Sequence, residues 1–199
     1  MVNYSNIFVN EGLSYSAYRD LVSSLLAAHQ TTGNDHSEAM LHYSKMNVQR
    51  MNRVDKTVAL QQPLSDTVGF IKKHYRLLVI SEGWCGDAAQ LLPLFQKIAA
   101  YAPGNFELRV VLRDSNLPLI DAHLTNGGRA IPKVLIIADN GELVAEWGPR
   151  PHVLQVLLNG WKAENPDMFA VAELLHHWYA KDKTQTTQDE LAAVFAALA

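Results

Sequence analysis

Cys85 is the side chain with the greatest chemical potential in this sequence, and it is the only cysteine among the 199 residues. It lies in the stretch LLVISEGWCGDAAQLLPLF, after an apolar run typical of a buried strand and at the start of a run with helical spacing. A helix start presents free N–H groups and the positive end of the helix dipole, which stabilise a thiolate. Cys85 is therefore a candidate nucleophile, with glycines on both sides that would leave its sulfur uncovered.

Asp87 stands in the first turn of the same expected helix. A carboxylate at this position suits the dipole, but it also competes with a neighbouring thiolate for the same field. Asp87 is a candidate to shuttle a proton for Cys85 or, alternatively, to cap the helix. The competing interpretation of Cys85 is a buried and inert thiol, because free cysteine is among the most buried residue types.

The elements that must position Cys85 follow an alternating pattern. Short apolar runs predict strands at residues 76–81, 106–113, 133–138 and 143–147, and helical patterns lie at 65–75, 87–102 and 117–124. Asn140-Gly141 between the last two apolar runs is a strong hairpin signal. The expected fold class is α/β: a mixed sheet that starts parallel, ends in an antiparallel edge and is flanked by helices.

Helical patterns also fill both ends of the chain. Asp35 with Glu38, and Thr187 with Glu190, predict capping boxes at the starts of two of these helices. We therefore expect an N-terminal helical extension over residues 1–62, a core over 63–150 and a C-terminal helical extension over 151–199, packed as one compact unit.

Composition excludes several classes of function. The net charge of −3 gives no broad cationic surface, so we expect neither nucleic acid nor a membrane as partner. The chain start lacks the layout of a secretion signal, and a single cysteine suits a reducing compartment, so the expected location is the cytoplasm. The eight histidines show no compact ligand spacing, so we expect no metal site, and no motif calls for a cofactor.

Four features, in this order, resemble the thioredoxin family: Trp84-Cys85-Gly86 after a strand, Pro93 inside the following helix, GGRAIPKVLII around Pro132, and the hairpin DNGELVAEWG. The resemblance covers about residues 64–150, and the long helical flanks suggest a bacterial subfamily. It implies a thioredoxin-like fold and a cis Ile131–Pro132 bond next to Cys85. It also implies a substrate groove lined by Trp84, Gly86, Ala88, Ile131 and Pro132.

Three positions depart from the family pattern. Ala88 replaces the resolving cysteine, Asp87 replaces the usual proline, and Val79 replaces a buried acid. Dithiol exchange needs a second thiol to release the mixed disulfide, and this chain has none.

Two main hypotheses follow from this incomplete motif. The first is monothiol exchange, in which Cys85 forms a mixed disulfide with glutathione, another small thiol or a protein cysteine and an outside thiol resolves it. A resolving cysteine on a partner protein is a variant of this scheme. The second is a catalytically inactive binding or scaffold module that grips an extended peptide in the groove of Cys85 and Pro132.

Overall fold

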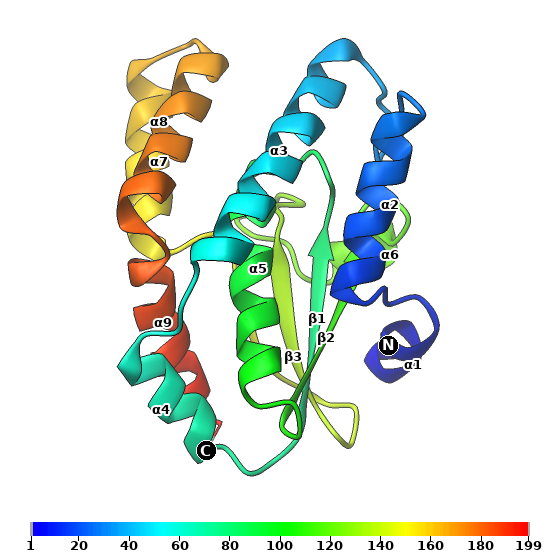
Figure 1. Ribbon diagram of the computed structural model, residues 1–199, viewed down its shortest axis with the longest axis vertical. Coiled ribbons are helices and arrows are strands. Elements are labelled where there is room, and N and C mark those ends of the chain that lie inside the picture. The colour runs from blue at the N-terminus through cyan, green and yellow to red at the C-terminus, as the bar shows by residue number, and fades with distance from the viewer. Residues whose placement is uncertain (1, 199) are drawn as a thin grey trace.

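A four-stranded mixed sheet lies at the centre of the computed structural model, which describes residues 2–198 (Figure 1). Its strands are β1 (Tyr75–Ser81), β2 (Phe106–Leu112), β3 (Lys133–Ala138) and β4 (Leu143–Trp147), in the order β2-β1-β3-β4. β1 pairs in parallel with β2 and antiparallel with β3, which pairs antiparallel with β4. The predicted α/β class, with a parallel start and an antiparallel edge, is confirmed.

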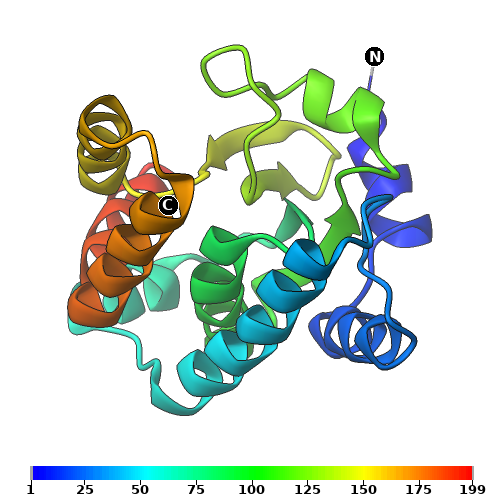
Figure 2. The ribbon, with the colours of Figure 1, turned by 90° about the horizontal axis from the view of Figure 1, so that it is seen from above.

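The helices cover both faces of this sheet, which explains why β1 and β3 are almost continuous runs of buried residues. Figure 2 shows α3 and α5 on one side of the sheet and α1 and α6 on the other. Within residues 2–198 the helices are α1 (Tyr4–Asn10), α2 (Tyr15–Ala27), α3 (Glu38–Thr57), α4 (Gln62–Phe70), α5 (Gly86–Tyr101), α6 (Leu117–Asp121), α7 (His152–Glu164), α8 (Met168–Asp182) and α9 (Gln185–Ala196).

Helices from both ends of the chain pack on the central elements. α3 packs on α5, α2 contacts both α3 and β2, and α9 packs on α4. The ring of Phe195 lies 5.3 Å from that of Phe106, and the Tyr75 hydroxyl donates to the carbonyl oxygen of Leu198 over 2.9 Å. Among residues 2–198, none of the helices combines the length and the apolar content that crossing a bilayer requires.

The start of β1 differs from the prediction of a helix over residues 65–75. Helix α4 ends at Phe70, and Tyr75 already belongs to β1. Tyr75 is 4% exposed and stacks on Phe106 of the neighbouring strand, so burial of its ring in the sheet outweighs the helical pattern.

Both predicted capping boxes are wrong. Ser37, not Asp35, caps α3, and the Asp35 side chain accepts from the N–H of Ser37 instead. Helix α9 begins at Gln185, so Thr187 and Glu190 lie inside it. The Glu190 carboxylate does not cap the helix. It accepts a hydrogen bond from the indole N–H of Trp147 over 3.0 Å instead.

The segment before β3 and the end of β4 meet at a glycine. The Ile131–Pro132 and Gly148–Pro149 peptide bonds are both cis. Gly148 has φ +114, and a Cβ atom there would lie 2.3 Å from the carbonyl oxygen of Pro132. Only glycine fits this conformation and this approach, so Gly148 holds the end of the hairpin against Pro132.

Candidate functional site

Cys85 caps the N-terminus of α5, directly beyond the carboxyl end of β1, as the sequence predicts. Its Sγ atom accepts the N–H of Ala88 over 3.5 Å and donates to the carbonyl oxygen of Ile131 over 3.3 Å. The residue is only 8% exposed. The structure therefore brings Cys85, Ala88 and Ile131 together, but around a buried sulfur.

Burial, and to a lesser extent the nearby Asp87 carboxylate, raise the pKa of the Cys85 thiol to about 12. The N–H of Ala88 and the Arg150 guanidinium act in the opposite direction but do not compensate. Donation to a carbonyl oxygen also requires the protonated thiol. Cys85 is therefore a neutral hydrogen-bond donor at neutral pH, and only a thiolate is a competent nucleophile.

Asp87 forms a buried ion pair rather than an open carboxylate. Arg150 donates from Nη2 to Oδ2 over 2.7 Å and from Nε to Oδ1 over 3.2 Å. The hydroxyl of Tyr179 donates to Oδ1 over 2.6 Å. Because both oxygens are occupied, Asp87 serves to join α5 to α8 and to the segment after β4.

Trp84 and Gly86, on either side of Cys85, are covered by other elements. The guanidinium of Arg113 lies 4.7 Å from the centre of the Trp84 ring system, a cation–π contact. The imidazole of His176 lies over Gly86, where an added Cβ atom would come within 2.6 Å of the ring. Burial lowers the pKa of His176 to about 4, so this ring is neutral as it covers the start of α5.

Pro132 and Ile131 are both buried. Two adjoining cavities of ≈ 270 and ≈ 210 Å³, which share Tyr43, Ala172 and His176, lie between α3 and α8. We call them the α3–α8 groove. Its smaller part reaches Trp84, Gly86 and Asp87, and its lining includes neither Cys85 nor Pro132.

Sequence reasoning missed the residues that close the site. Arg150 and Tyr179 lie 63 and 92 positions from Asp87, and no local pattern indicates such pairs. Glu82 carried a visible signal, because a lone acid at the end of an apolar strand is unusual. Its buried carboxylate binds the Thr32 hydroxyl and the N–H of Asp114, and burial raises its pKa.

The histidines and carboxylates suggest no further centre. Among residues 2–198, no three His, Cys, Asp or Glu side chains gather as a metal site requires. Val79, where the family keeps a buried acid, is fully buried among apolar residues.

Comparison with known proteins agrees with the fold described above. A family profile described as thioredoxin matches residues 33–164, about two thirds of the chain. A protein of unknown function from Pseudomonas aeruginosa, PA1234, has a solved structure that superposes with a TM-score of 0.65 at 18% identity, over 100% of both chains. An HIV epitope-scaffold matches with a TM-score of 0.56 at 20% identity, over 94% of this chain and 100% of the other. No curated protein matches this chain.

Proposed function

Because this chain belongs to the thioredoxin family, we propose that it is a binding module built on the thioredoxin fold, in which Cys85 takes no part in turnover. The observation that carries the proposal is the closed state of the Cys85 site. The thiol is buried, donates to Ile131 and sits beside an Asp87 whose two oxygens are already bound. The proposed binding surface is the α3–α8 groove.

The α3–α8 groove has the composition of a peptide-binding surface. Tyr43, Met46 and Arg50 of α3 face Phe169, Ala172 and His176 of α8 across it. The rings of Tyr43 and Phe169 are nearly parallel, 14° apart with centres 6.3 Å apart, yet Phe169 remains 66% exposed. Tyr43 and Met46 are half-buried, and a hollow lined by aromatic and methionine side chains is typical of surfaces that bind apolar side chains of a partner.

Arg50 adds a charge preference to this surface. Burial and the neighbouring Arg53 lower the pKa of its guanidinium, which is hydrogen bonded to Asn47 over 2.7 Å. Arg50 has no ion-pair partner among residues 2–198, although Glu173 lines the same groove. A partner carboxylate would supply that charge, so the proposed occupant is a protein segment with an apolar side chain followed by Asp or Glu.

Selection of binders from a random peptide library displayed on phage, with the full chain as bait, tests the proposal. We expect recovered peptides to share an apolar residue and a nearby carboxylate. Phe169→Ala should weaken their binding about tenfold or more. Val156→Ala, a 55% exposed position on α7 outside the groove, is the matched control and should have no effect. If the recovered peptides bind Phe169→Ala as tightly as wild type, the assignment of the groove is contradicted.

Monothiol exchange through Cys85 is the second candidate function. It is favoured by one observation, the N–H of Ala88 that points at the sulfur from the start of α5. Incubation with glutathione disulfide followed by mass spectrometry distinguishes the two candidates. The binding-module proposal predicts no mixed disulfide on the folded chain and unchanged peptide affinity in Cys85→Ser. A rapid and stoichiometric mixed disulfide would favour exchange instead.

A further inference from the structure

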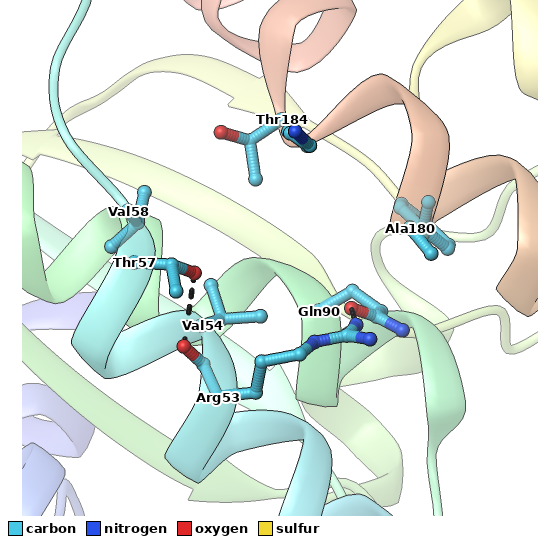
Figure 3. Close-up of a pocket in the computed structure, with 9 residues that line it drawn as sticks. Arg53, Val54, Thr57, Val58, Gln90, Ala180 and Thr184 are labelled. Atoms are coloured by element: carbon cyan, nitrogen blue, oxygen red, sulfur yellow. Dashed lines mark hydrogen bonds between the residues drawn. The ribbon is translucent and has the colours of Figure 1, made fainter.

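A separate cavity lies between the C-terminal half of α3, the N-terminal half of α5 and the junction of α8 with α9 (Figure 3). Its volume is ≈ 330 Å³, and it shares no lining residue with the α3–α8 groove. Small-molecule pockets start at about 300 Å³, so the space fits a small ligand.

The charged side chains that line this cavity are all cationic. Arg53 and Lys183 contribute positive charge, and no aspartate or glutamate belongs to the lining. The carboxylate nearest in sequence, Asp182, is directed at Thr186, whose N–H it accepts over 3.2 Å. The cavity therefore favours an anion, and no acidic side chain of its lining supplies one.

Gln90 gives the cavity a directed donor. The residue is only 3% exposed, and its Oε1 atom accepts from Nη2 of Arg53 over 3.0 Å. This bond assigns the amide orientation, so the Nε2 group carries two N–H donors, and no acceptor for them exists among residues 2–198. Figure 3 shows Gln90 and Arg53 side by side at one wall of the cavity. The Nε2 atom is not among the buried polar atoms that lack a partner, so water can reach it in the free chain, and a ligand oxygen in the cavity would replace that water as the acceptor.

Apart from the hydroxyl-bearing residues Thr57, Tyr179 and Thr184, the rest of the lining is apolar. Val54 of α3 and Val58, the residue that follows α3, face Ala180 of α8 across the cavity (Figure 3). A ligand that satisfies both walls needs an anionic head and a short apolar tail.

We propose that this cavity binds a small carboxylate with a short apolar tail. The carboxylate oxygens accept from the planar guanidinium of Arg53 and from Nε2 of Gln90, and Lys183 adds a second positive charge. The tail lies against Val54 and Val58. A carboxylate suits the fork of N–H donors on Arg53, whereas a neutral head group would leave both cations unpaired.

Titration of the full, isotope-labelled chain with hexanoate, followed by NMR of the Gln90 side-chain amide, tests the proposal. We expect a saturable shift of that amide with hexanoate. Hexanamide, which has the same tail without the charge, and inorganic phosphate, which has charge without a tail, should both bind at least about tenfold more weakly. If hexanamide or inorganic phosphate binds as tightly as hexanoate, the assignment of a carboxylate with an apolar tail is overturned.

Variants locate the binding in this cavity. Arg53→Met and, separately, Lys183→Met should each lower the affinity for hexanoate, the first by about tenfold or more, as expected for a lost charged hydrogen bond. Lys181→Met, at an exposed position of α8 outside the lining, is the matched control and should leave affinity unchanged. Both Arg53 and Lys183 are exposed, so the variants should fold. Unchanged affinity in both, or no saturable shift with hexanoate, overturns the proposal.

Discussion

The hydroxyl of Tyr179 donates a hydrogen bond to Oδ1 of Asp87 over 2.6 Å and thereby joins α8 to the first turn of α5. Arg150 binds both oxygens of the same carboxylate. Three segments far apart in the sequence therefore meet on a side chain two positions after Cys85. Asp87 therefore holds the C-terminal helices against the start of α5.

Asp87→Asn should destabilise the fold by about 3 kcal/mol, because it leaves the buried Arg150 guanidinium without its charge partner. The side chains of Arg150 and Asp87 are only 13% and 8% exposed, so solvent cannot replace the lost interaction. Urea unfolding measures the change. Asp121→Asn, which breaks the exposed pair with Arg129, is the matched control and should remain close to wild type. Equal effects of the two substitutions would contradict a structural role for Asp87.

Tyr179→Phe removes the hydroxyl and keeps the buried ring. A hydrogen bond to a charged group contributes about 2 kcal/mol, so unfolding free energy should fall by that amount. Tyr101→Phe, at a residue that is 54% exposed, gives the comparison for loss of an exposed hydroxyl and should have little effect. A Tyr179→Phe protein as stable as wild type would show that α8 is held by other contacts.

Gly86→Ala tests how closely α8 covers the Cys85 site. The new methyl group would lie 2.6 Å from Cε1 and 2.9 Å from Nε2 of His176, so we expect a loss of about 1–3 kcal/mol. His176→Ala in the same chain should restore most of this loss, because it removes the clash. Gly160→Ala has nothing within 4 Å and should be neutral or slightly stabilising. A loss that His176→Ala does not relieve would mean that the backbone of α5, not the ring, is perturbed.

The sheet and the position of Cys85 could be predicted from sequence because both depend on local signals. Each of these signals, namely the four apolar runs, the Asn140-Gly141 turn and the helical pattern after Gly86, is contained in a short stretch of sequence. Every predicted strand is found within one residue of its expected bounds. The ordered motifs around Trp84 and Pro132 then pointed to the family that the profile match shows.

The closure of the site could not be predicted, because it depends on pairs that are distant in sequence. Nothing near Asp87 indicates that Arg150 and Tyr179 will bind it. No local signal places His176 over Gly86, because its position follows from the docking of α8 rather than from its neighbours in sequence. The capping box predicted at Thr187 and Glu190 is wrong for the same reason, since Glu190 binds Trp147 across the fold, whereas the one at Asp35 is wrong because the neighbouring Ser37 caps α3.

Stability should fall at alkaline pH in a way that depends on Cys85. The thiol keeps its proton in the folded chain, where its pKa is about 12, but loses it near 9.0 when unfolded. Its contribution is therefore complete below pH 9.0 and is lost as pH rises from 9.0 towards 12, by up to about 1.4 kcal/mol per pH unit.

Urea unfolding of wild type and Cys85→Ala over this pH range measures that contribution as a difference in slope. Tyr15, Tyr18 and Tyr179 also have raised pKa values, and burial, the largest cause in each, is common to both proteins. The smaller contribution of Cys85 to the pKa values of Tyr18 and Tyr179 is part of the difference that this comparison measures. The cavity left by Cys85→Ala lowers the free energy of unfolding by the same amount at every pH, so it does not change the slope. Parallel slopes for the two proteins would show that the folded thiol titrates normally.

The rate at which iodoacetamide alkylates Cys85 at neutral pH tests the central claim most directly. It is measured on the folded chain and on the same chain in urea, by mass spectrometry against time. A buried thiol with a pKa of about 12 predicts alkylation at least about a hundredfold slower in the folded chain. Alkylation of the folded chain as fast as that of the unfolded chain, or faster, would contradict a closed and inert Cys85.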